Sequence, residues 1–161
     1  MRVTRVAVLV AFGLLILASN RSIPSGLAEG SVRQQLIGAW QLVSNEEMVN
    51  GKLTKQDQTG ILTYTSDGHM SVQIMDKLSD KNPSASRDGG PVKYSANGYE
   101  SYFGTYDVNE AAHSVTHHVQ GALVRSLIGT DLTRIYTFSG KQLVLISSRP
   151  DESWRIVWEH Y

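Results

Sequence analysis

The chain has no cysteine among its 161 residues. Disulfide bonds therefore cannot contribute to its stability, and a lipid cannot be attached through an N-terminal cysteine. A chain of this length is expected to form one domain, and such a domain can bury enough apolar surface to be stable without cross-links. We expect a single soluble domain that depends on its hydrophobic core alone.

The N-terminal region also lacks an apolar run that is long enough to cross a bilayer. The run Val6–Ala18 has 13 residues, whereas a membrane-spanning helix needs about 20. Two arginines precede the run and small residues follow it, which is the order found in a secretory signal peptide. We expect cleavage after Ala28, so that residues 1–28 are a signal peptide and residues 29–161 form a secreted or periplasmic domain. An uncleaved membrane anchor is the alternative.

Neither sign of charge is in excess, because the chain has 15 basic and 15 acidic residues. Loss of residues 1–28 would remove three arginines and no acid, which leaves 12 basic and 15 acidic residues and a net charge of −3. Nucleic acids and anionic membrane surfaces select basic patches. We therefore expect no nucleic-acid partner and no stable membrane attachment after cleavage. The sequence carries no signal for oligomeric state.

Helical periodicity is nearly absent after residue 37. Ser31 is a suitable N-cap for a short helix over about 32–37. Beyond it, alternation of apolar and polar residues predicts eight strands, at about 36–44, 59–65, 69–75, 99–108, 114–123, 130–138, 142–148 and 153–161. Short turns separate most of them and favour antiparallel pairing. The predicted fold class is all-β, an eight-stranded antiparallel up-and-down barrel with a short N-terminal helix.

Two connections are longer than a tight turn. The polar stretch Asn45–Gln58 contains the turn signal Asn50-Gly51, and we expect part of it to pair as a short hairpin extension. Asp76–Asn97 collects prolines, glycines and polar residues without any period, which predicts a long loop. Loops of that length are often lids or binding loops, and a merely solvated loop is the alternative.

Gly38-Ala39-Trp40 opens the first predicted strand, where the glycine leaves room beside the indole. This stretch resembles the Gly-x-Trp signature of the lipocalins, and Thr130-Asp131-Leu132 is similar to their Thr-Asp-aromatic motif except at Leu132. The closer resemblance is to the bacterial and fungal lipocalin-like domain family, through motifs in the same order at Leu36–Ser44, Tyr64–Val72, Tyr102–Tyr106, Val115–Val119 and Gly129–Arg134. The resemblance implies a calycin-type barrel that handles small molecules. Some small lipocalin-like barrels are cyclases or isomerases.

One parity of each strand faces the inside of a closed barrel. The bulkier parity predicts an inward face made of Trp40, Leu42, Leu62, Tyr64, Met70, Val72, Ile74, Tyr102, Tyr106, Val108, Val115, His117, Val119, Leu132, Arg134, Tyr136, Phe138, Trp154, Ile156 and Trp158. No carboxylate lies in this set. The same parity points His118, Asp107, Asp131, Arg155 and Glu159 outward.

Arg134 is the most informative residue of the inward set. A buried guanidinium keeps its charge and needs an anion or several carbonyl groups. In the arrangement that the lipocalin resemblance implies, an arginine packs over the signature tryptophan, here Trp40, and Arg155 competes for that role. The functional alternative is an anion site for a carboxylate, enolate or phosphate group of a ligand.

His117 is the second polar residue of the inward set. His117 and His118 are adjacent on one strand and face opposite sides, and His113 would lie roughly 13 Å from His117 on an extended strand. We therefore expect no metal site. A core histidine held by a tyrosine hydroxyl is one reading, and ligand contact or general acid-base chemistry is the other.

These residues predict a pocket for a small hydrophobic molecule, with an anionic group on that molecule as a further option. The candidate ligand-binding residues are Tyr64, Met70, Tyr102, Tyr106, His117, Arg134 and Tyr136. We assign Trp154 and Trp158 to closure of the core. The alternative is an isomerase, cyclase or hydro-lyase in which His117 is the acid-base and Arg134 steadies an oxyanion. A third possibility is an inert module with a filled barrel. No cofactor is expected.

Overall fold

The computed structural model describes residues 31–77 and 98–161. The predicted signal peptide and almost all of the predicted loop over 76–97 lie outside the described residues. The described chain contains one α-helix, one 3-10 turn and nine strands, which are α1 (Val32–Leu36), β1 (Gly38–Val49), β2 (Lys52–Gln56), β3 (Gln58–Tyr64), β4 (His69–Asp76), β5 (Tyr99–Asn109), β6 (Ser114–Ala122), η1 (Arg125–Leu127), β7 (Asp131–Ser139), β8 (Gln142–Ser147) and β9 (Trp154–His160).

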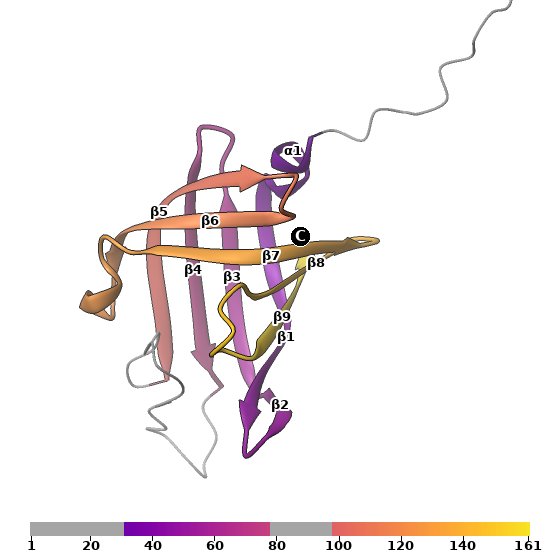
Figure 1. Cartoon of the computed structure of the whole chain (residues 1–161), viewed down its shortest axis with the longest axis vertical. Coiled ribbons are helices and arrows are strands. Elements are labelled where there is room, and N and C mark those ends of the chain that lie inside the picture. Colours follow the sequence, from indigo (N-terminus) through magenta and orange to yellow (C-terminus); the bar gives the residue numbers. More distant parts are fainter. Residues whose placement is uncertain (1–30, 78–97) are drawn as a thin grey trace, which may run out of the picture.

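The strands form one antiparallel sheet that closes on itself (Figure 1). Strands β1 and β3 to β9 pair in sequence order, and β1 also pairs with β9 to complete the barrel. The remaining strand, β2, pairs with the second half of β1 through the turn at Asn50-Gly51. The eight-stranded up-and-down barrel is therefore confirmed, and so is the hairpin extension. The first strand runs five residues further than predicted, to Val49.

Alternation of side chains along the strands creates the core. In β4, for example, Met70, Val72 and Ile74 are buried, while the residues between them are more exposed. The predicted inward face is correct for the large apolar residues, and Arg134 and His117 are buried among them with 5% and 2% of their surface exposed. Since burial of apolar surface is the main favourable term in folding, this inner face accounts for most of the stability.

Helix α1 covers one end of the barrel (Figure 1). Ser31 caps the helix by accepting a hydrogen bond from the backbone N–H of Gln34, as the sequence predicts. The helix places Leu36 in the core with no exposed surface. Arg33 lies over the ring of Tyr106, with 4.9 Å from its Cζ to the ring centroid. We call the end of the barrel that α1 covers the closed end.

The Gly38-Ala39-Trp40 motif belongs to the closed end. Gly38 has a φ of +133°, and a Cβ at this position would collide with the ring of His160, so that only glycine is compatible with this packing. The indole Nε1–H of Trp40 donates to the carbonyl oxygen of Leu36 at 2.8 Å. The motif therefore joins α1, β1 and β9 into one packed unit.

A β-bulge in β1 changes which residues of this strand face inward. The register of β1 against β9 shifts between Leu42 and Ser44. A bulge adds one residue and reverses the parity beyond it, so that Asn45 rather than Ser44 is buried, with 3% of its surface exposed. The first strand predicted from the sequence ends at Ser44, and the alternation of its residues does not reveal this reversal.

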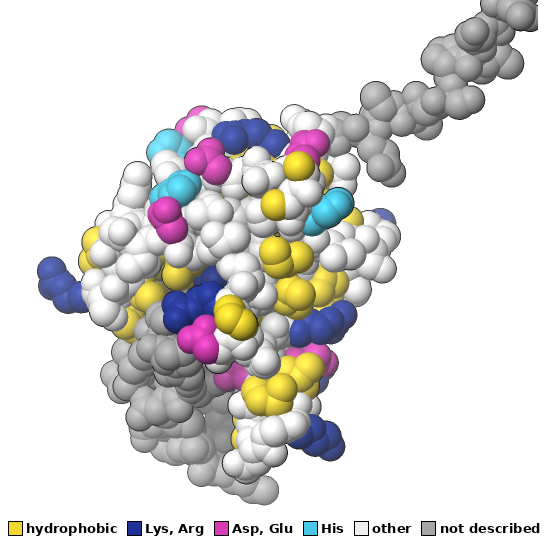
Figure 2. Space-filling view, viewed as in Figure 1, with side chains coloured by type: hydrophobic (Ala, Val, Ile, Leu, Met, Phe, Trp, Pro, Cys, Tyr) yellow, Lys and Arg dark blue, Asp and Glu magenta, His cyan; other side chains and the backbone are white. Residues whose placement is uncertain are grey.

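The described surface has a mixed character. On the face shown in Figure 2, acidic, basic and hydrophobic side chains are interspersed. Within residues 31–77 and 98–161, no helix combines the length and apolar character that crossing a membrane requires.

Candidate functional site

A cavity lies inside the barrel, and each of the eight strands of the barrel contributes at least one residue to the cavity wall. The apolar part of the lining consists of Leu62, Val72, Ile74, Leu145 and Ile156, together with the rings of Trp154 and Trp158. The polar part consists of Asn45, Glu47, Glu100, Tyr102, His117 and Arg134. An apolar cavity with a few polar groups is the usual composition of a small-molecule site.

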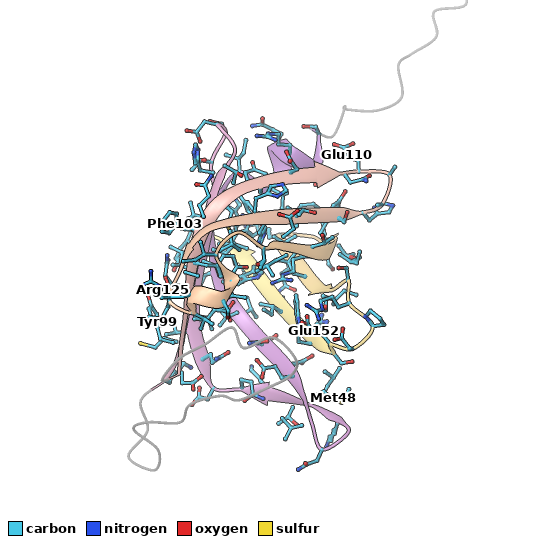
Figure 3. The ribbon with its side chains drawn as sticks, turned by 60° about the vertical axis from the view of Figure 1, so that its left-hand side comes forward. Met48, Tyr99, Phe103, Glu110, Arg125 and Glu152 are labelled. Carbon is cyan, nitrogen blue, oxygen red and sulfur yellow. The ribbon has the colours of Figure 1, made fainter. Side chains whose placement is uncertain are left out.

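The cavity opens away from α1. Its partly exposed lining residues, Glu47, Glu100 and Trp154, lie at the end of the barrel opposite the helix. In Figure 3, Met48 and Glu152 mark this end and Glu110 marks the end that carries α1. The empty space is about 510 Å³ when the solvent at the opening is included, and the part that the centres of water molecules can occupy is about 50 Å³. We call the end of the barrel at which the cavity opens, away from α1, the open end.

His117 is held on both sides of its ring by tyrosines. Its Nε2 lies 2.7 Å from the hydroxyl of Tyr64, and its Nδ1 lies 3.0 Å from the hydroxyl of Tyr102. The three residues come from β3, β5 and β6, and they form a hydrogen-bonded row across the interior. Tyr102 and His117 line the cavity, whereas Tyr64 lies behind His117 in the core.

The direction of these hydrogen bonds follows from Tyr64. Among the described residues its hydroxyl has one hydrogen-bond partner, Nε2 of His117, and only 1% of Tyr64 is exposed. A buried hydroxyl proton needs an acceptor, so we assign Tyr64 as the donor to Nε2. The neutral imidazole then carries its proton on Nδ1 and donates it to Tyr102. The hydroxyl proton of Tyr102 is thereby directed away from His117.

Burial keeps His117 neutral. Desolvation lowers the pKa of His117 well below its ordinary value, and the charges of Arg134 and His118 lower it further. Desolvation also raises the pKa of the Tyr64 hydroxyl well above its ordinary value. Both groups are therefore uncharged at neutral pH, in agreement with the direction of the hydrogen bonds.

Arg134 faces the cavity from β7 and stacks on Trp154. Its Cζ lies 4.9 Å from the centroid of the Trp154 ring, and its Nη1 donates to the carbonyl oxygen of Thr133 at 3.4 Å. The predicted packing over Trp40 is wrong, because Trp40 lies in the closed end against His160. Arg155, the predicted competitor, pairs with Glu46 at 3.6 Å instead.

A row of amides fixes the orientation of Asn45. The side-chain nitrogen of Gln58 donates to a carboxylate oxygen of Asp76 at 2.7 Å, so the oxygen of Gln58 faces Asn45. The Nδ2 of Asn45 donates to that oxygen at 2.9 Å and to Glu47 at 3.3 Å. Because the carboxylate can only accept, the polarity of the whole row is set, and Asn45 turns its nitrogen toward Gln58.

The structure separates the predicted ligand-binding residues into two groups. Tyr102, His117 and Arg134 line the cavity. Tyr64, Met70, Tyr106 and Tyr136 are buried but are not part of its lining. Tyr106 donates to the carbonyl oxygen of Thr65 at the closed end.

Ten further residues line the cavity without having been predicted as site residues. Five of these are the aliphatic residues named above, and the other five are Asn45, Glu47, Glu100, Trp154 and Trp158. The first two depend on the bulge in β1, which the sequence pattern does not reveal. Glu100 lies two residues before Tyr102 on β5 and therefore faces the same side of the sheet. The alternation that predicted Tyr102 could also have identified Glu100. Trp158 belongs to the hydrophobic core and Trp154 packs against it, as predicted, and both also line the cavity.

His118 forms a separate cluster on the outer surface of the barrel. Its Nδ1 lies 2.7 Å from Asp131 and its Nε2 lies 3.0 Å from Asp107. The hydrogen bond to Asp131, followed by the one to Asp107, raises the pKa of His118. The outward direction of these residues is as predicted. Across the part of the chain that the structure describes, no three His, Cys, Asp or Glu side chains are grouped so that they could hold a metal ion.

A family model and several solved structures are similar to this chain. A family model described as a lipocalin-like domain matches residues 37–160. A lipocalin-like protein from Bacteroides uniformis is 16% identical over 79% of this chain and 99% of its own, with a TM-score of 0.46. An uncharacterized protein from Bacteroides eggerthii is 14% identical over 78% of this chain and 99% of its own, also with a TM-score of 0.46. No curated protein matches the sequence.

Proposed function

The chain belongs to the lipocalin-like domain family, and from that premise we propose that it binds a small, largely apolar molecule in the cavity of its barrel. The observation that carries the proposal is the cavity itself, which has aliphatic and aromatic walls from eight strands and few polar groups. Such a wall removes the apolar part of a ligand from water, and the polar groups set its orientation.

The size of the cavity limits the ligand. The space open to the centres of water molecules is about 50 Å³, which is enough for more than one water molecule. A single ring or a short chain fits this interior. A longer molecule would extend through the open end.

Charge is the second limit on the ligand. Arg134 favours an anionic group, and its stacking on Trp154 leaves the edge of the guanidinium as the hydrogen-bonding surface. Glu47 and Glu100 line the same cavity and oppose an anion by repulsion. We therefore expect the apolar part of the ligand to provide most of the affinity. Comparison of the binding of a carboxylic acid with that of its ester would test whether an anionic group adds to it.

Catalysis is the second candidate function, and one observation favours it. Tyr102 lines the cavity and is backed by His117 and Tyr64 in a hydrogen-bonded row. In an isomerase or cyclase, Tyr102 would exchange a proton with the substrate and His117 would be the acid-base behind it. Replacement of His117 by Gln should then abolish turnover of an identified substrate, and unchanged turnover would exclude this mechanism.

Export is part of the proposal through residues 1–28. A basic N-terminal segment followed by a 13-residue apolar run supports a cleavable signal peptide. Expression of the full chain in a Gram-negative host, fractionation and mass determination of the product test this directly. The expected product starts at Glu29, and a full-length product in the membrane fraction would contradict it.

A cavity-filling variant tests the binding proposal. Val72 lines the cavity, so Val72→Phe should reduce binding of small probes such as toluene and phenol by at least about tenfold. The matched control is Val43→Phe, the same change at a residue of β1 that is 42% exposed. Binding is measured by NMR titration of the purified protein. If neither probe binds the parent protein, or if the two variants bind equally, the proposal is wrong.

A further inference from the structure

The three tryptophan indoles differ in their hydrogen bonds. Trp40 Nε1 donates to the carbonyl oxygen of Leu36 at 2.8 Å, and Trp154 Nε1 donates to a carboxylate oxygen of Glu152 at 3.2 Å. Trp158 is only 1% exposed, yet its Nε1 is buried without a partner among the described residues. A buried indole N–H normally has an acceptor. Trp158 therefore holds an unused donor, and it lines the cavity.

Asn45 holds an unused acceptor in the same wall. Its Nδ2 is engaged by Gln58 and Glu47, but its Oδ1 is buried without a partner in the described part of the chain. The amide cannot exchange the two atoms by rotation, because the row that begins at the Asp76 carboxylate requires nitrogen on the Gln58 side. The atom that Asn45 leaves unpaired is therefore an acceptor.

The donor and the acceptor lie on neighbouring strands. Asn45 is on β1 opposite Ile156, and Trp158 is two residues beyond Ile156 on β9. Side chains at such diagonal positions on one face are within reach of a single small ligand. Both residues line the same cavity with part of their side chains. The two polar atoms themselves have almost no accessible surface, so a ligand that pairs with them must shift the side chains that cover them. A bound group that pairs with both atoms would remove two unfavourable buried groups at once.

We propose that the cavity selects a neutral, hydroxyl-bearing apolar molecule, whose hydroxyl donates to Asn45 Oδ1 and which presents an oxygen acceptor to Trp158 Nε1–H. This inference rests on the proposed ligand-binding function and names the ligand class for the same cavity. A phenol or a small alcohol satisfies both atoms. A hydrocarbon satisfies neither, and an ether satisfies only Trp158.

The same atoms disfavour a charged ligand. A carboxylate has no proton to donate to Asn45, and it would enter a cavity that Glu47 and Glu100 also line. An ammonium group could donate to Asn45 but offers no acceptor to Trp158. Sites built to pair with a hydroxyl reject analogues that lack it, because the polar groups of the protein then stay unpaired.

Four probes of similar size distinguish these cases: phenol, anisole, toluene and benzoate. We expect phenol to bind the purified protein most tightly, followed by anisole and then toluene, with about tenfold between phenol and toluene. Phenol should also shift the indole N–H resonance of Trp158 in ¹H–¹⁵N spectra more than toluene does. The resonance is assigned by its loss in Trp158→Phe.

Two variants separate the donor from the acceptor. In Asn45→Leu, phenol should bind no better than anisole, while anisole stays ahead of toluene. In Trp158→Phe, anisole should fall to the level of toluene, while phenol stays ahead of both. The control is Gln41→Leu, which makes the same kind of change at an exposed, outward-facing residue of β1 and should leave the order of the probes unchanged.

The failures of the two proposals give different results. If toluene or benzoate binds the parent protein as tightly as phenol, or if phenol keeps its advantage over anisole in Asn45→Leu, the hydroxyl inference is overturned and the ligand-binding function stands. If no probe binds and Val72→Phe changes nothing, the binding function itself fails. Because Trp158→Phe tests the donor independently, a poorly folded Asn45→Leu protein does not prevent a decision.

Discussion

The two ends of the barrel treat similar side chains differently. At the closed end, the Trp40 indole donates to Leu36, and Tyr106 donates to Thr65. In the wall of the cavity, Trp158 Nε1 and Asn45 Oδ1 are equally buried but have no hydrogen-bond partner in the described residues. The closed end resembles an ordinary protein core, in which almost all buried polar atoms are paired.

This difference indicates how the barrel divides stability and function. Unpaired buried polar atoms destabilise the protein by about 1–3 kcal/mol each, so they are retained where another role requires them. Both such atoms belong to residues of the cavity lining. The paired polar groups of the closed end then offset the loss of stability that the two unpaired atoms cause.

The largest expected effect comes from removing the indole nitrogen at the closed end. Trp40→Phe loses a buried hydrogen bond, leaves the Leu36 carbonyl oxygen without that donor and creates empty space, so we expect the free energy of unfolding to fall by about 3 kcal/mol. In Trp158→Phe the lost ring volume is offset by removal of an unpaired N–H, and the change should stay within about 1 kcal/mol. Urea denaturation followed by circular dichroism measures both. Equal losses would show that the two ends do not differ.

A smaller effect is expected where the two regions meet, at His117. His117→Phe removes the partner that the buried Tyr64 hydroxyl has among the described residues, and we expect the free energy of unfolding to fall by about 2 kcal/mol. If the unpaired hydroxyl is the cause, adding Tyr64→Phe should restore about 1 kcal/mol. A double variant that is less stable than His117→Phe would instead indicate that the volume of the histidine ring matters most.

The fold was predictable because a closed barrel needs little more than strand parity and short turns. Met70, Val72 and Ile74 show the alternation directly, and the buried set of the structure follows it. The glycine of Gly38-Ala39-Trp40 also has a local reason, its positive φ and its contact with His160. Such features depend on neighbours in the chain or on one strand partner.

The candidate site was predicted only in part, because it depends on contacts across the barrel. The bulge between Leu42 and Ser44 turns Asn45 and Glu47 inward. No residue type in that stretch indicates that a bulge is present. The choice between Trp40 and Trp154 as the partner of Arg134 depends on how far each strand is shifted along the barrel. His117 was placed inside correctly, but its pairing with both Tyr64 and Tyr102 needed the three strands in register.

The smallest expected effect is a difference in pH dependence between adjacent histidines on the two sides of the sheet. Burial lowers the pKa of His117, so the folded state binds fewer protons there than the unfolded state. Its contribution to stability is therefore present above the ordinary histidine pKa of about 6.5 and is lost as the pH falls below it. Asp131 and Asp107 raise the pKa of His118, so its contribution is complete below about 6.5 and is lost as the pH rises.

Single replacements should expose these opposite signs. Between pH 7.5 and 5, His118→Gln should lose stability more steeply than the parent protein, because the compensating gain is gone. His117→Gln should lose it less steeply, whatever its absolute stability. The measurement is the free energy of unfolding in urea at a series of pH values, with the slopes compared. Parallel slopes in all three proteins would mean that neither histidine changes its proton affinity on folding, and the distinction between a dry interior and a solvated outer face at this strand would then be wrong.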